Sequence, residues 1–196
     1  MIKYISNKIL NFIYKNCSLP DDMKEVYQYG IEMTISSILN IILIISISLL
    51  VKDFISGIVF LLFFIPLRIY CGGYHATSYF RCNTVFVITY VLVFLIGTSL
   101  STVFKNYIQV AEVILLLSFI PVLIFSPVKN KHKKLSDSTA KKCRIISIIL
   151  YIVLALASIF FCSMELYGSI MVITLASVSV MILVEIFMQR RGYHEV

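Results

Sequence analysis

Six long runs of apolar residues, separated by short polar stretches, constrain this sequence more than any other feature. They lie at 31–51, 54–67, 84–104, 107–125, 145–162 and 167–188. A helix needs roughly 20 apolar residues to cross the hydrocarbon core of a bilayer, with a range of about 17–25. Five runs reach that length. The run 54–67 is shorter, and Pro66 followed by Arg68 predicts that its end is kinked or sunk into protein.

The composition supports a membrane protein and argues against a soluble domain. Hydrophobic residues make up 60% of the chain and charged residues only 14%, whereas globular domains are usually about half apolar and a quarter charged. The sequence therefore predicts an all-α integral membrane protein with about six transmembrane helices. Residues 1–196 form a single membrane domain in this interpretation, with the transmembrane bundle at 30–188 and a cytoplasmic tail at 189–196.

The region 1–29 precedes the first run and is predicted to be amphipathic and interfacial. Within 1–16, apolar residues recur at helical spacing, with polar residues on the other side of the helix. Such a helix either lies in the headgroup region of an anionic leaflet or packs against the rest of the protein. The apolar residues are Ile2, Ile5, Ile9, Phe12 and Ile13.

The distribution of positive charge predicts the topology. With a cytoplasmic N-terminus, only Lys52 and Lys105 of the 17 basic residues fall outside the cytoplasmic segments. Cytoplasmic loops carry an excess of Lys and Arg, so both termini are expected in the cytoplasm. The net charge of +7 is therefore explained by topology and attraction to anionic lipids, and no nucleic-acid partner is expected.

Three carboxylates, Glu32, Glu112 and Glu185, lie near the ends of apolar runs. They can reach the interface or pair locally, so they are not interpreted as a proton relay. The sequence also lacks an internal repeat, which weakens a transporter interpretation.

The stretch 68–82, between the second and third runs, carries the side chains best suited to chemistry. His75 and Cys82 are the ingredients of a thiol nucleophile and its base. The thiolate is the reactive form of cysteine, and an adjacent imidazole takes its proton. Arg81 and Arg68 would favour the thiolate electrostatically.

A straight helix through this stretch would keep the two groups apart. Residues seven apart on one helix are separated by about 10.5 Å along its axis at 1.5 Å per residue, so His75 and Cys82 could not form a hydrogen bond there. The chain between them must bend or be re-entrant. Gly72 and Gly73 make such a backbone path plausible.

Other interpretations of these side chains stay open. Each of the five cysteines could be a small buried hydrophobe, and an odd count is no disulfide framework. Cys71, His75 and Cys82 could also bind zinc, although no fourth ligand is evident. No metal and no cofactor is expected.

Two motifs resemble a known family. The first is GGYHA at 72–76, followed by Cys82, and the second is SPVKNKHKKLS at 126–136. Together with the length, the number of spans and the amphipathic N-terminus, they are similar to AgrB, the accessory gene regulator protein B of Gram-positive bacteria. The resemblance covers nearly the whole chain.

The resemblance implies a function. AgrB proteins are membrane-embedded cysteine endopeptidases that cleave an AgrD-type propeptide near its acidic tail and retain the N-terminal part as a thioester. Cyclisation then gives a thiolactone or lactone autoinducing peptide for quorum sensing. By resemblance, His75 and Cys82 are the catalytic dyad, and Arg68 and Gly73 match positions needed for activity. A homodimer and an active site on the cytoplasmic side of the bacterial membrane are also implied.

The basic stretch 129–144 is predicted to be a loop, and it has two interpretations. It is either a positive-inside anchor attracted to lipid or a docking patch for the acidic propeptide tail. The patch would consist of Lys129, Lys131, Lys133 and Lys134. Two functions without catalysis also remain: a multispan transporter or export channel for a small peptide, and a structural or sensory membrane subunit.

Overall fold

The computed structural model describes residues 2–16, 23–73, 78–103, 107–128, 137–161 and 165–191. Within these residues the chain forms seven helices and no strand. The helices are α1 (Ile2–Asn16), α2 (Lys24–Leu50), α3 (Phe54–Cys71), α4 (Tyr79–Val103), α5 (Tyr107–Phe125), α6 (Asp137–Phe160) and α7 (Glu165–Arg190).

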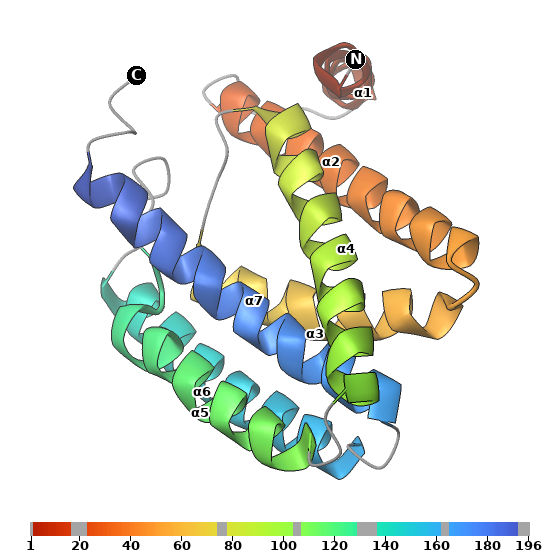
Figure 1. Cartoon of the computed structure of the whole chain (residues 1–196). Coiled ribbons are helices and arrows are strands. Elements are labelled where there is room, and N and C mark those ends of the chain that lie inside the picture. The colour runs from red at the N-terminus through yellow and green to blue at the C-terminus, as the bar shows by residue number, and fades with distance from the viewer. Residues whose placement is uncertain are drawn as a thin grey trace.

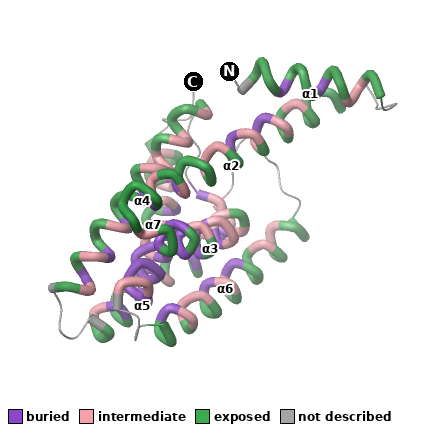
Figure 2. The backbone as a smooth tube through the Cα atoms, turned by 90° about the vertical axis from the view of Figure 1, so that its right-hand side faces the viewer, coloured by how far each residue is buried: buried purple, intermediate pink, exposed green. Residues whose placement is uncertain are grey.

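Helix α7 lies at the centre of the bundle. It packs against α3, α4, α5 and α6, and α2 joins the bundle through α3 and α4 (Figure 1). Buried positions concentrate on α7 and α3, whereas α2, α5 and α6 turn many apolar side chains outward (Figure 2). Such an exposed apolar surface suits a protein whose solvent is lipid.

Six of the helices, α2 to α7, are long and apolar enough to cross a membrane. The expectation of an all-α membrane protein with six spans is therefore confirmed, and α1 is the additional N-terminal helix. Helix α5 has the predicted bounds, and α3 continues through Pro66 to the buried Cys71. The short second run thus ends inside protein, as its length suggested.

Three spans, α2, α4 and α6, begin earlier than the apolar runs indicated, and α4 begins at Tyr79. Helix α2 starts at Lys24 and α6 starts at Asp137, so the first turns of both helices are polar. Hydropathy detects only the part of a helix that suits hydrocarbon, whereas backbone hydrogen bonding continues into the headgroup region. Lys141, Lys142 and Arg144 consequently lie on a helix and not in a loop.

Small residues let neighbouring helices approach closely. A Cβ atom added at Gly57 would lie 2.7 Å from Ser48 of α2, and one added at Gly97 would lie 3.0 Å from Ile170 of α7. Ser169 also donates a hydrogen bond of 2.8 Å to the Gly97 carbonyl. Helix association in lipid depends on such close packing and on hydrogen bonds, because lipid removes the hydrophobic driving force.

Aromatic rings fill the space between α3 and α4. Phe60 packs against Phe64, Phe86 and Tyr90, with ring centroids 5.0, 5.6 and 5.2 Å apart. The Tyr90 hydroxyl lies 2.9 Å from the Ser56 hydroxyl, so the polar end of this buried ring is satisfied. This cluster fixes α4 against α3 below the candidate site.

Helix α1 packs against the rest of the protein, which is one of the two placements considered for it. Its Ser6 and Leu10 are buried, and Ser6 Oγ donates a hydrogen bond of 3.2 Å to the buried Glu32 carboxylate of α2. Its Tyr4 and Phe12 are 64% and 70% exposed. The helix therefore docks on α2 and still presents apolar side chains outward.

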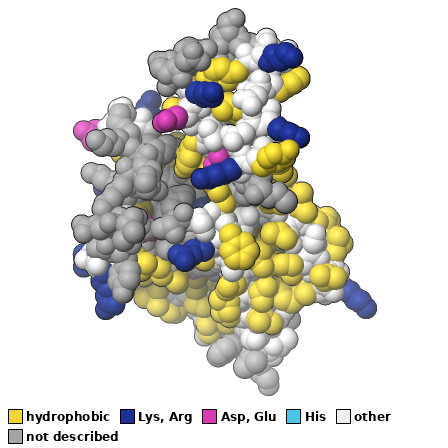
Figure 3. All heavy atoms as spheres, turned by 90° about the horizontal axis from the view of Figure 1, so that it is seen from above, with side chains coloured by type: hydrophobic (Ala, Val, Ile, Leu, Met, Phe, Trp, Pro, Cys, Tyr) yellow, Lys and Arg dark blue, Asp and Glu magenta, His cyan; other side chains and the backbone are white. Residues whose placement is uncertain are grey.

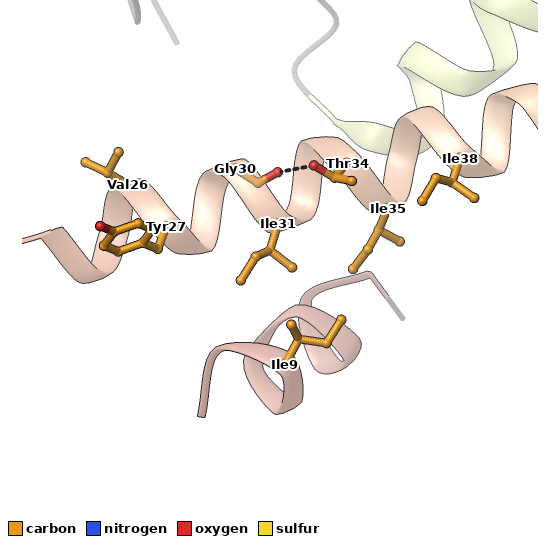
Figure 4. A pocket seen from close by; sticks show the side chains of 8 residues that line it. All are labelled: Ile9, Val26, Tyr27, Gly30, Ile31, Thr34, Ile35 and Ile38. Carbon is orange, nitrogen blue, oxygen red and sulfur yellow. Dashed lines mark hydrogen bonds between the residues drawn. The ribbon is translucent and has the colours of Figure 1, made fainter. Parts of the chain in front are cut away.

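A shallow groove of about 480 Å³ lies beside the contact between α1 and the first half of α2 (Figure 4). Its lining is apolar except for the hydroxyls of Tyr27 and Thr34, and Thr34 donates to the Gly30 carbonyl of its own helix at 2.9 Å. The groove contains none of the residues predicted to be catalytic. The lining residues are Ile9, Val26, Tyr27, Gly30, Ile31, Thr34, Ile35 and Ile38.

Candidate active site

Two glycines end α3 and direct the chain away from the helix. Gly72 and Gly73 have φ angles of 72° and 122°, a region that favours glycine. A Cβ atom at Gly72 would lie 3.1 Å from the Val128 carbonyl oxygen, and the Val128 N–H donates a hydrogen bond of 2.9 Å to the Cys71 carbonyl. The beginning of the second sequence motif therefore packs directly on the first.

Cys82 lies in the first turn of α4. The Arg81 N–H donates to the Ser78 hydroxyl at 3.3 Å, and the Cys82 N–H donates to the Ser78 carbonyl at 3.0 Å. Ser78 is thus an N-cap, which sequence reasoning missed although serine is among the preferred residues there. The Cys82 side chain is half-buried, and the positive end of the α4 dipole lies beside it.

The helix that holds Cys82 does not continue from the helix before it. Helix α3 ends at Cys71 and α4 begins at Tyr79, so His75 precedes α4 in the sequence. The arrangement that would have forbidden a dyad, one uninterrupted helix through both residues, is therefore absent from this chain. His75 itself lies outside the described residues.

Arg68 connects the two halves of the site. Its Nη1 donates a hydrogen bond of 2.6 Å to the Gly72 carbonyl, and its guanidinium interacts electrostatically with Cys82 of α4. The Arg81 side chain, by contrast, is exposed. The effect of either arginine on the Cys82 thiolate stays a prediction.

Gly73 provides the space that the Arg68 side chain occupies. A Cβ atom at Gly73 would overlap the Nη1 atom of Arg68 and would lie 3.7 Å from the Ile182 nitrogen of α7. The turn after α3 therefore lies against both the guanidinium and α7. Glu185, which also interacts electrostatically with Arg68, lies one helical turn beyond Ile182.

The second cysteine of this region, Cys71, has different surroundings. It is fully buried, and it lies near the Ser126 and Ser147 side chains. Those two hydroxyls lie 2.6 Å apart and join the end of α5 to α6. Hydropathy gave no sign of this serine pair, because its two members are far apart in the sequence.

The four lysines of the proposed docking patch, like His75, lie outside the described residues. Among the described residues, no group of three His, Cys, Asp or Glu side chains could hold a metal ion. Lys and Arg side chains are scattered over the face that carries both ends of the chain (Figure 3). Broad hydrophobic areas adjoin them, as expected of a protein at a membrane surface.

The fold and site define a multi-pass membrane protein with a half-buried cysteine at the start of a spanning helix and a half-buried arginine near it. The sequence model of Accessory gene regulator B, AgrB, matches residues 6–188. This chain therefore belongs to the AgrB family, and the resemblance seen in its two motifs is confirmed. Membership supports a general role in processing an AgrD-type propeptide for quorum sensing.

Similar proteins occur in clostridia. A Clostridium perfringens (strain SM101 / Type A) protein named "Putative AgrB-like protein" is 28% identical over 145 residues, which cover 72% of this chain and 68% of the relative. A protein of the same name from Clostridium beijerinckii is 28% identical over 160 residues, covering 79% and 77% of the two chains. No solved structure matches this chain.

Proposed function

We propose that this protein is a membrane-embedded cysteine endopeptidase that cuts an AgrD-like propeptide on its C-terminal side and promotes cyclisation of the product. The observation that carries the proposal is the placement of Cys82: half-buried, in the first turn of a spanning helix, and under the electrostatic influence of Arg68. Burial of Cys82 favours the thiol, whereas a helix N-terminus and a nearby cation both favour the thiolate.

The reaction would begin with transfer of the Cys82 proton to His75. The Cys82 sulfur then attacks the scissile carbonyl carbon, the C–N bond breaks, and the proton passes from His75 to the leaving amine. The N-terminal part of the peptide remains on Cys82 as a thioester. An internal thiol or hydroxyl of the peptide attacks this thioester, the bond to Cys82 breaks, and the thiol of Cys82 is restored.

Exclusion of water decides whether the thioester cyclises or hydrolyses. Cys71 and Leu67, in the last turns of α3, are fully buried, and Gly73 is buried against α7. Buried protein therefore bounds the site on the side of α3 and α7. Exclusion of water on that side would protect the thioester from hydrolysis. Acyl transfer from one thiol to another has little net cost. The distribution of positive charge supports a cytoplasmic location for this end of the bundle.

Trapping the thioester tests this function directly. The full chain in lipid vesicles should form a hydroxylamine-sensitive adduct with the N-terminal fragment of the propeptide, located on Cys82 by mass spectrometry. Cys143, another half-buried free cysteine, is the matched control, and its alanine variant should form the same adduct. Transport of intact peptide with no adduct would instead support the export channel and overturn the enzyme.

Substrate docking would use the basic loop. We expect that neutralising Lys129, Lys131, Lys133 and Lys134 together raises KM for the propeptide and leaves kcat nearly unchanged, since these contacts exist before and during reaction. In the unaltered protein KM should rise with ionic strength, because screening acts over about 8 Å at physiological salt. Cysteine accessibility from each side must show normal orientation. An unchanged KM in both assays would make the loop a topological anchor only.

A further inference from the structure

Glu185 is an acidic residue inside the last third of a membrane-spanning helix. Only 4% of its surface is exposed, and its Oε1 accepts a hydrogen bond of 2.9 Å from Gln189 of the same helix. A buried carboxylate is costly in a membrane protein unless a cation compensates it. Its position toward the C-terminal end of α7 adds an unfavourable interaction with the helix dipole.

Arg68 of α3 is a cation in the surroundings of Glu185. The two side chains interact electrostatically, and the same guanidinium also interacts with Cys82 and Cys71. Contact between the backbones is close here, because a Cβ atom on Gly73 would meet both the Arg68 side chain and the Ile182 nitrogen of α7. The Arg68 side chain therefore lies beside the turn after α3, and that turn packs on the helix that carries Glu185.

Arg68 has two effects that depend on where its guanidinium sits. Its bond of 2.6 Å to the Gly72 carbonyl holds the start of the segment that leads to His75, and its charge acts on Cys82. Arginine is long and flexible, so neither effect is secured by α3 alone. A carboxylate on a different helix supplies a second fixed point.

We propose that Glu185 is a positioning residue of the Cys82 site, which acts by holding Arg68 between the Gly72 carbonyl and the Cys82 thiol. The proposal rests on the proposed function for its relevance to turnover. Its physical core, the control of Cys82 reactivity through Arg68, is measurable without any substrate.

The direction in which the pH midpoint of Cys82 alkylation shifts distinguishes this role from its alternatives. Alkylation of Cys82 by iodoacetamide is followed against pH in full-length protein in nanodiscs, with the other four cysteines replaced by serine. If Glu185 positions Arg68, Glu185→Gln releases the cation and the alkylation midpoint moves to higher pH by about 1 unit. If Glu185 only contributes its own negative charge, the midpoint moves to lower pH. An unchanged midpoint means a structural role. Either of the last two results overturns the proposal.

A double-mutant cycle guards against misfolding of the single variants. Arg68→Gln should also raise the midpoint, and Glu185→Gln should add nothing further once Arg68 is absent. The double variant buries two neutral amides and should therefore fold even if a single variant leaves one charge uncompensated. Additive shifts would overturn action through Arg68. Glu112→Gln is the matched control, since Glu112 is an exposed acid on α5, and it should not shift the midpoint.

Propeptide turnover distinguishes failure of this inference from failure of the function. If Cys82→Ala still processes the propeptide, the endopeptidase mechanism fails, whatever the alkylation curves show. If processing needs Cys82 but Glu185→Gln leaves both kcat and the midpoint unchanged, only the positioning role fails. We expect Glu185→Gln to lower kcat by roughly 10-fold or more with little change in KM.

Discussion

Cys71 and Cys82 are two free cysteines near the same arginine, and they differ in burial and in their position on a helix. Both interact electrostatically with Arg68. Cys71 ends α3, is fully buried, and lies near the Ser126 and Ser147 side chains. Cys82 begins α4 and is half-buried. A nearby cation therefore does not by itself make a nucleophile, because access to substrate and the start of a helix are also needed.

The largest expected difference between these cysteines is in propeptide processing. Cys82→Ala should abolish cleavage in reconstituted vesicles, because the proposed thioester forms on the Cys82 sulfur. Cys71→Ala should retain partial activity or better, since that thiol only fills space in the core. Cleavage is measured by mass spectrometry of the released fragments. Full processing by Cys82→Ala, or complete loss in a correctly inserted Cys71→Ala, would break the comparison.

Removal of the proposed base tests whether the difference between Cys82 and Cys71 depends on His75. His75→Ala should lower turnover by about 10²–10⁴-fold, the usual contribution of general acid–base catalysis. The same variant should slow alkylation of Cys82 near neutral pH while Cys71 stays unreactive. Stopped-flow or quenched alkylation of each single-cysteine protein measures both rates. Equal loss of reactivity at both cysteines would indicate general unfolding and not loss of a base.

Gly73→Ala tests whether the space for Arg68 matters to Cys82. An alanine there would adopt a strained φ of 122° and overlap the guanidinium, which costs on the order of 1–3 kcal/mol in backbone strain alone. We expect turnover to fall by about 10²-fold, as misplacement of a site group by 1 Å can produce. The matched control is Gly30→Ala, because a Cβ atom at Gly30 meets nothing within 4 Å. Similar activity losses in both variants would contradict this account.

The smallest effect is expected on the Cys71 side. Ser147→Ala removes the hydroxyl that lies 2.6 Å from Ser126, and a buried hydrogen bond contributes about 1 kcal/mol to stability. Thermal unfolding in detergent should move to slightly lower temperature, with no change in the alkylation rate of Cys82. A large change in that rate would show that the serine pair belongs to the reactive site.

The candidate site was only partly readable from the sequence. The GGYHA motif and Cys82 could be recognised because they are contiguous or nearly so, and the need for a bend between them follows from helix geometry. The N-cap Ser78 was also within reach of sequence rules. The partners Glu185 and Val128 were not, because each belongs to a segment distant in sequence that reaches Arg68 or Gly72 only after the helices pack.

The amino-acid sequence alone determined that this is a membrane protein surrounded by lipid and how many helices span the membrane. Hydropathy and the distribution of charge are local properties, so six spans and the bounds of α5 follow without knowledge of any contact. The tertiary structure decided which helix faces meet. It placed α7 at the centre, docked α1 on α2 through Ser6 and Glu32, and brought Arg68 to Cys82. In lipid these choices depend on close fit and hydrogen bonds between helices, which a single helix does not encode.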